Sequence, residues 1–239
     1  MPLPYLAGVY VVEERAAMAK GFPFTLPFVR TLDLKLDDRV TILVGENGSG
    51  KSTILEAMAE LMGLPWDGGS TNEVADSERT DNPRLSEFMR PRVKHKPRNK
   101  YFFRAEALSD FAHLLEAREK DPDFWGDPYA RYGGKTIRAR SHGEGVRELL
   151  KSHDKPGLYF FDEPEAALSP KAQVEFVKVI NTRVATDSFQ FVIATHSPII
   201  MSIDGAQLIS LDGGQLAPTK KEDTSHWKTY AALFAKGTL

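Results

Sequence analysis

The chain has 239 residues, 41% of them hydrophobic, which is enough for one large α/β domain or two small ones. The net charge of −2 argues against a globally basic nucleic-acid-binding protein, and the absence of cysteine excludes disulfides, thiolate zinc sites and cysteine nucleophiles. No run approaches the ~18 apolar residues of a membrane span, and no secretory signal pattern opens the chain, so we expect a cytoplasmic protein without direct membrane contact.

Short strand patterns occupy the start of the chain. Residues 9–12 are Val, Tyr, Val and Val, which is typical of a strand. Leucines alternate with polar residues over 32–36 and predict a second, half-buried strand. Residues 40–44 are β-branched or apolar throughout, as in a buried strand. We expect a turn at 37–38 to join the last two strands as a hairpin.

The segment after residue 44 fits the phosphate-loop pattern of Gly, four residues, then Gly-Lys-Ser. It reads Gly45-Glu46-Asn47-Gly48-Ser49-Gly50-Lys51-Ser52-Thr53. A helix pattern follows to residue 62, with Gly63 at its expected C-cap. In such a strand, turn and helix, backbone N–H groups and the helix dipole bind phosphate, Lys51 reaches the β- and γ-phosphates, and Ser52 reaches Mg²⁺. The alternative is a purely structural glycine-rich turn.

Residues 84–104 form a basic segment with a single acid, Glu87. Its eight basic residues are Arg84, Arg90, Arg92, Lys94, Lys96, Arg98, Lys100 and Arg104. One interpretation is a surface that contacts a nucleic-acid backbone. The other is a solvated basic hairpin, with which Pro91 and Pro97 agree equally well.

Helical patterns dominate the middle of the chain. Residues 101–103 read as a strand, and Ser109 then caps a predicted helix that runs to Lys120. A further helix is expected from Gly145 to Ser152. Together these elements suggest a small helical subdomain at about 105–150 within a single domain, 1–239.

Two apolar strands in the second half end in polar residues. Residues 158–161 lead into Asp162 and Glu163, and residues 189–194 lead to His196. A helix is predicted between them, over 171–184.

A strand at 207–211 and a last helix complete the pattern. Thr224 or Ser225 is the predicted cap of this helix. Its large apolar residues are expected to face the core; they are Trp227, Tyr230, Leu233 and Phe234.

In an open α/β sheet, ligands bind outside the carboxyl ends of the strands. We therefore expect Asp162 to face Mg²⁺ or its water shell, and Glu163 to polarise an attacking water. His196 is expected to contact the γ-phosphate. The structural alternatives are an ordinary acidic pair after a strand and a packed or surface histidine.

In order and spacing, four segments resemble the ABC-type ATPase superfamily. They are residues 45–53 as Walker A, 158–164 as Walker B with the catalytic glutamate Glu163, 167–170 as the D-loop with Leu168 and Ser169, and 194–197 as the switch histidine. The resemblance implies an α/β P-loop NTPase with a mixed sheet core, flanking helices, an N-terminal antiparallel β part and a small helical subdomain. It also implies ATP and Mg²⁺ as cofactors and a head-to-tail, ATP-dependent homodimer.

Several family positions differ here. The candidate signature motif, which would act on the partner's nucleotide, is Ser141, His142, Gly143 and Glu144. Glutamine is absent before Gln173, so Glu106 is the candidate for the metal-contacting place that the family gives to glutamine. Phe22 or Phe24 is the candidate aromatic for stacking on adenine.

The resemblance is greatest to the non-transporter branch: RecF-, SMC- and OLD-like proteins and small stand-alone AAA/ABC ATPases. Glu106 and Ser141 are too close in sequence for an SMC-type coiled-coil arm. Three hypotheses remain. The first is an ATP-hydrolysing switch that acts with an unknown protein partner or, through residues 84–104, with nucleic acid. The second is the nucleotide-binding subunit of an ABC transporter with a separate membrane chain. The third is a module that binds ATP with little hydrolysis.

Overall fold

The computed structural model describes residues 4–66, 68–69, 83–106, 118–121, 125–128, 130, 150, 152–186 and 188–236. The candidate signature motif, most of the expected subdomain at 105–150 and most residues of the two helices predicted there lie outside these residues. Among the described helices, none has the length and apolar character needed to cross a membrane.

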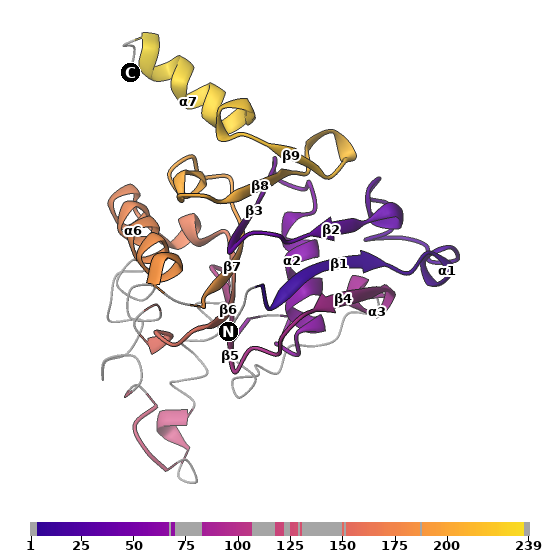
Figure 1. Cartoon of the computed structure of the whole chain (residues 1–239), viewed down its shortest axis with the longest axis horizontal. Helices are drawn as coiled ribbons and strands as arrows, with labels where there is room; N and C mark the ends of the chain where they lie inside the picture. The colour runs from indigo at the N-terminus through magenta and orange to yellow at the C-terminus, as the bar shows by residue number, and fades with distance from the viewer. Residues whose placement is uncertain are drawn as a thin grey trace.

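A six-stranded sheet forms the centre of the described fold (Figure 1). Its order is β5 (Asn99–Arg104), β6 (Gly157–Asp162), β7 (Gln190–Ala194), β3 (Val40–Val44), β8 (Gln207–Ser210) and β9 (Ala217–Thr219). The pairs from β5 to β8 are parallel, and β9 runs antiparallel to β8. Every residue of β3, β6 and β7 is buried, as expected for parallel strands that are covered on both faces.

A second, antiparallel sheet consists of β2 (Asp33–Lys35), β1 (Leu6–Val11) and β4 (Met89–Val93). The predicted hairpin between 32–36 and 40–44 is wrong, because β2 pairs with β1 while β3 joins the large sheet. The physical reason is burial: β2 exposes alternate residues and belongs on a half-covered sheet, whereas the wholly apolar β3 requires a central position.

Two helices cover the large sheet. Helix α2 (Lys51–Leu61) contacts both β4 and the strands β6 and β7, and so lies between the two sheets. Helix α6 (Pro170–Thr186) covers the opposite face, where the sequence predicted a helix over 171–184 (Figure 1). The short elements are α1 (Glu13–Ala16), α3 (Leu85–Phe88) and the 3₁₀ turns Val29–Thr31, Pro164–Ala167, Ile200–Ser202, Asp212–Gly214 and Lys221–Asp223.

Alternation along the strands divides the core into two clusters. Phe102 and Phe160 point to the α2 side, whereas Phe103 and Phe161 point to the α6 side. On that side Phe161 packs edge-on against Phe176 of α6 at a centroid distance of 5.1 Å. This double-sided packing fixes the strand ends where the polar segments begin.

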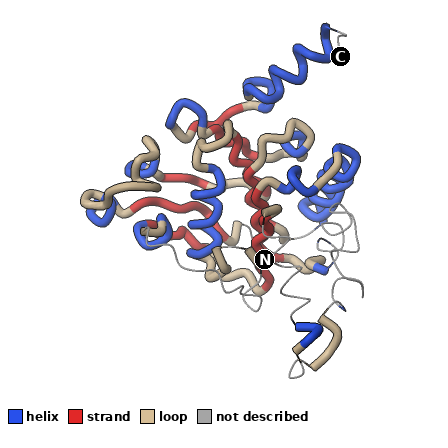
Figure 2. The backbone as a smooth tube through the Cα atoms, turned by 180° about the vertical axis from the view of Figure 1, so that it is seen from behind, coloured by secondary structure: helices blue, strands red, loops and turns tan. Residues whose placement is uncertain are grey.

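The last helix, α7 (Ser225–Lys236), extends away from the rest of the fold (Figures 1 and 2). Thr224 caps it as predicted, because its Oγ1 accepts a 3.3 Å hydrogen bond from Trp227 N. The prediction of a core-facing apolar side is wrong: Tyr230 is 49% exposed and Phe234 71% exposed. Helical spacing predicts an apolar stripe but does not specify what covers it.

Candidate functional site

The carboxyl ends of β6, β7 and β3 lie side by side, because β7 pairs with both neighbours. Backbone hydrogen bonds continue past the strand ends, from Glu163 N to Ala194 O at 2.9 Å and from Thr195 N to Leu43 O at 3.1 Å. The acidic segment, the histidine segment and the phosphate loop therefore meet at one edge of the sheet.

Lys51 lies buried inside the phosphate loop. Its Nζ donates to Gly45 O at 2.8 Å and to Glu46 O at 3.0 Å. Gly50, at the start of α2, has φ 96°, and a Cβ there would lie 2.9 Å from both Leu26 and Phe28. Glycine is required at this position both by backbone conformation and by space.

Glu46 is held by Asp212, Ser225 and His226, none of which the sequence analysis assigned to the site. Asp212 accepts a 2.9 Å hydrogen bond from Glu46 N. Ser225 donates to the Glu46 carboxylate, and His226 Nε2 lies 3.9 Å from it. No local signal marks these residues, since they come from the segments after β8 and β9. The first turn of α7 thus rests on the phosphate loop.

Ser52 and Asp162 form the candidate metal site. Ser52 Oγ donates to Asp162 Oδ1 at 2.9 Å, and Asp162 is 5% exposed. Mg²⁺ is commonly held by one or two protein oxygens together with phosphate oxygens and water, and this donor set fits that pattern. Among the described residues, no group of three or more His, Cys, Asp or Glu side chains is arranged for a metal.

Arg104, at the end of β5, lies beside the Asp162 carboxylate. Its Nε is 3.6 Å from Asp162 Oδ2, and its guanidinium also pairs with Glu56 at 2.9 Å and with Glu106 at 3.4 Å. The Glu106 side chain, predicted as a metal contact, is 86% exposed. Arg104, rather than Glu106, is therefore the β5 residue in contact with Asp162.

Burial changes the acidity of two carboxyl groups in this cluster. Burial raises the pKa of Glu56 to about 7, although the Arg104 charge opposes the shift. Burial likewise raises the pKa of Asp162 to about 6, against the lowering effects of Arg104 and of the Ser52 hydrogen bond.

Glu163 has a left-handed backbone, with φ 45° and ψ 52°, and is the single non-glycine residue with positive φ among those described. Its Oε1 lies 3.9 Å from Lys51 Nζ and 3.9 Å from His196 Nδ1. Strained backbone of this kind is concentrated at functional sites. The predicted catalytic residues Lys51, Glu163 and His196 are thus adjacent.

The predicted D-loop, residues 167–170, lies shortly after Glu163 in the chain. Leu168 is buried, and its carbonyl accepts a 2.9 Å hydrogen bond from Gln173 Nε2. Ser169 is exposed just before α6, and its Oγ lies 3.4 Å from Ala172 N. Gln173 Oε1 also accepts a 2.6 Å hydrogen bond from Ser197 Oγ, which connects this segment to the His196 loop.

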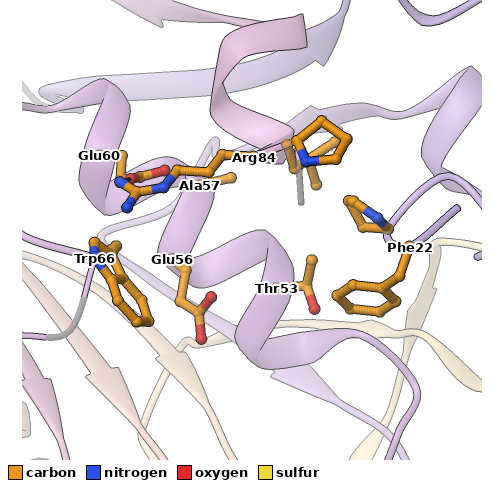
Figure 3. Close-up of a pocket in the computed structure, with 10 residues that line it drawn as sticks. Phe22, Thr53, Glu56, Ala57, Glu60, Trp66 and Arg84 are labelled. Atoms are coloured by element: carbon orange, nitrogen blue, oxygen red, sulfur yellow. Dashed lines mark hydrogen bonds and ion pairs between the residues drawn. The ribbon is translucent and has the colours of Figure 1, made fainter. Parts of the chain in front are cut away.

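A pocket of 280 Å³ opens beside α2 (Figure 3). Phe22, Thr53 and Trp66 contribute to its lining, together with Arg84, whose guanidinium lies 5.3 Å from the Trp66 ring. The Phe22 ring is 54% exposed. Phe24 is 5% exposed and packs edge-on against Phe88 at 4.7 Å, so it offers no free face for stacking.

Several residues of the basic segment, 84–104, already form ion pairs with acidic side chains. Arg84 pairs with Glu60, Arg92 with Asp33 and Arg104 with Glu56. Lys94, Lys96 and Arg98 are exposed in the turn between β4 and β5. This turn is therefore the part of the basic segment where exposed basic side chains cluster.

Two protein-family models match the chain. One, described as "AAA domain, putative AbiEii toxin, Type IV TA system", matches residues 84–202, and the other, described as "AAA domain", matches residues 23–99. Both models describe AAA domains, and together they match residues 23–202. No curated protein matches this chain. The matched ranges include the phosphate loop and both polar strand ends.

Three solved structures illustrate the similarity of this chain to known proteins. "An inward-facing conformation of a putative metal-chelate type ABC transporter" has a TM-score of 0.49 and 15% identity over 86% of this chain and 81% of that one. "SMC head domain from Thermotoga maritima" has a TM-score of 0.45 and 16% identity over 91% and 99%. A structure of "the SmcHead bound to the C-winged helix domain of ScpA" has a TM-score of 0.46 and 16% identity over 91% and 98%.

Proposed function

We propose that this chain binds ATP at the phosphate loop and hydrolyses it in a Mg²⁺-dependent reaction with a positioned water. The observation that carries the proposal is the convergence of Lys51, Asp162, Glu163 and His196 at one sheet edge, with Lys51 and His196 each 3.9 Å from Glu163. A cation and a carboxylate beside a phosphate loop are groups that phosphoryl transfer to water uses, and an imidazole next to them can contact the γ-phosphate.

Binding uses the loop of residues 45–53 and the pocket beside it. The loop's N–H groups and the N-terminus of α2 favour an anion. Lys51 now donates to two loop carbonyls, and in the complex it would donate to the β- and γ-phosphate oxygens instead. The exposed ring of Phe22 and the side chain of Thr53 line the neighbouring pocket, so we assign the adenine base to it.

The metal would be held by Ser52 Oγ and the Asp162 carboxylate, the oxygen pair already joined by a 2.9 Å hydrogen bond. When bound there, Mg²⁺ supplies neutralisation of charge on the β- and γ-phosphates. Arg104 keeps a positive charge 3.6 Å from the same carboxylate and so favours its ionised form.

The chain's own residues then have separate roles. Glu163 orients a water toward the γ-phosphate and accepts its proton. Lys51 stabilises the charge that develops on the transferred group, and His196 contacts the γ-phosphate from the opposite side. The left-handed backbone at Glu163 directs its side chain into the space between Lys51 and His196.

The proposal includes an ATP-dependent homodimer that serves a protein partner. Exposed Ser169 of the candidate D-loop would meet a second copy, and the candidate trans residues Ser141, His142, Gly143 and Glu144 would complete the partner's nucleotide site. The alternative is the nucleotide-binding subunit of a transporter, for which co-purification with membranes would be the distinguishing observation. Turnover unaffected by Glu163→Gln would favour a binding module.

The test is phosphate release together with sedimentation velocity. Glu163→Gln should lower turnover by about 10²- to 10⁴-fold while keeping ATP binding. With ATP and Mg²⁺ this variant should also sediment as a dimer. Glu14→Gln, which changes an exposed acid on α1, should match the wild type in both assays. A Glu163→Gln protein that stays monomeric at high concentration would contradict the dimer, and one with normal turnover would contradict the mechanism.

A further inference from the structure

A third carboxylate of the acidic segment, Glu165, has no part in the mechanism above. Its side chain is only 6% exposed. Oε1 of this residue accepts two hydrogen bonds, from Thr195 Oγ1 at 2.7 Å and from His196 N at 2.8 Å. Burial of a carboxylate is costly unless it is hydrogen-bonded, so this contact is a strong anchor for the histidine loop.

The same oxygen also lies close to the His196 ring. His196 Nδ1 is 3.3 Å from Glu165 Oε1. Nδ1 of His196 and Oε2 of Glu165 are both buried without a hydrogen-bond partner among the described residues. Leaving the buried Nδ1 without a partner is unfavourable, and Glu165 Oε1, at 3.3 Å, is the acceptor toward which the ring can turn.

Several charged or titratable groups surround the His196 ring at different distances. Glu163 Oε1 lies 3.9 Å from Nδ1, and the His226 ring lies 5.3 Å away between centroids. Glu46 lies 3.9 Å from His226 Nε2, and Lys51 Nζ lies 3.9 Å from Glu163 Oε1. Glu165 is therefore the nearest acceptor to Nδ1, and the His196 side chain is 35% exposed.

We propose that Glu165 is a positioning residue for His196. It fixes the 195–196 backbone, accepts a hydrogen bond from Nδ1–H, and so leaves Nε2 as the ring nitrogen that faces the ligand. Which ring nitrogen of a histidine is available is set by the hydrogen bond that the other one makes. The role of Nε2 at the γ-phosphate depends on the proposed function, whereas the Glu165–His196 contact does not.

Gln173 provides a control on the same loop. It accepts a hydrogen bond from Ser197 Oγ and donates one to Leu168 O, and no described hydrogen bond joins it to the His196 ring. Gln173→Leu should therefore loosen the loop without changing the ring nitrogen that carries the proton. Glu165→Ala removes both the hydrogen bonds to the 195–196 segment and the acceptor for Nδ1–H. Glu165→Gln keeps an acceptor oxygen.

The experiment is ¹⁵N–¹H NMR of protein labelled at its six histidines, without nucleotide, with His196→Asn to assign the ring. The Nδ1–H form is expected for His196 in the wild type, in Gln173→Leu and in Glu165→Gln, and a shift toward Nε2–H in Glu165→Ala. An unchanged His196 ring signal in a folded Glu165→Ala protein would overturn the proposal. If Glu165→Ala does not fold, a wild-type ring in the Nε2–H form would overturn it equally.

Turnover separates this inference from the proposed function. Glu165→Ala should lower kcat by about 10- to 100-fold, the size usual for a group that orients a functional histidine, with a smaller change in KM for ATP. Glu165→Gln should recover most of the loss. A wild type with the Nδ1–H ring but no ATP turnover would overturn the proposed function and leave the positioning role in place.

Discussion

Ser52 Oγ donates a 2.9 Å hydrogen bond to Asp162 Oδ1 across 110 positions of sequence. Ser52 lies in the first turn of α2 and Asp162 ends β6, and both are fixed by the packing of α2 on the sheet. Because Asp162 is 5% exposed, its charge is little screened by solvent and acts strongly on a nearby cation. The pair therefore determines the predicted metal dependence.

Ser52→Ala should raise the Mg²⁺ concentration for half-maximal turnover by about 10-fold or more, because one of two protein oxygens is lost. ATP binding without Mg²⁺ should persist, since Lys51 and the loop N–H groups remain. Titration of turnover with MgCl₂ measures the first effect and calorimetry in EDTA the second. An unchanged Mg²⁺ requirement would remove Ser52 from the metal site.

Backbone strain at Glu163 can be measured by two substitutions that both remove its carboxylate. At φ 45° alanine is strained and glycine is not, so Glu163→Gly should be more stable to unfolding than Glu163→Ala by about 1 kcal/mol. Both variants should lose turnover. Urea unfolding gives the difference, and equal stability of the two would mean that the left-handed backbone is absent in solution.

Glu56 should make stability depend on pH. Its pKa is about 7 in the folded chain against an ordinary value of 4.5, so the folded state binds more protons between these values. The contribution of Glu56 to the free energy of unfolding should therefore fall by about 3 kcal/mol as pH rises from 4.5 to about 7, and stay level above that range.

Glu56→Gln should remove this part of the pH dependence, because the amide cannot ionise yet still accepts a hydrogen bond from Arg104. Urea unfolding at pH 5 and pH 8 gives the comparison. The matched control is Glu14→Gln, which should keep the wild-type dependence. If the free energy of unfolding of the Glu56→Gln variant falls by the same amount, the pH dependence belongs to other groups.

Sequence patterns predicted the phosphate loop, the acidic pair and the histidine because each is local and follows a buried strand. Parallel strands share an edge, so their convergence followed from fold class. Arg104 was different: it was one of eight basic residues, and only the register of β5 against β6 places it opposite Asp162. The exposure of the apolar residues of α7 could also not be predicted, because tertiary packing decides what covers a helix face.

The turn between β4 and β5 supplies the test for nucleic acid. Replacing Lys94, Lys96 and Arg98 with glutamine should make the negative slope of log affinity against log salt for duplex DNA less steep by about 3, if each contacts a phosphate. A control that replaces three exposed lysines elsewhere, Lys20, Lys171 and Lys178, should keep the slope. Equal slopes in both triple variants would exclude this turn as the contact.

Lys51 provides the most direct test of the nucleotide site. Its Nζ lies within the loop, donating to Gly45 O at 2.8 Å, where phosphate oxygens would replace the carbonyls. Isothermal titration with MgATP should give one site per wild-type chain and no measurable binding to a folded Lys51→Ala protein. Wild-type affinity in Lys51→Ala would contradict the assignment of the phosphate loop and the function built on it.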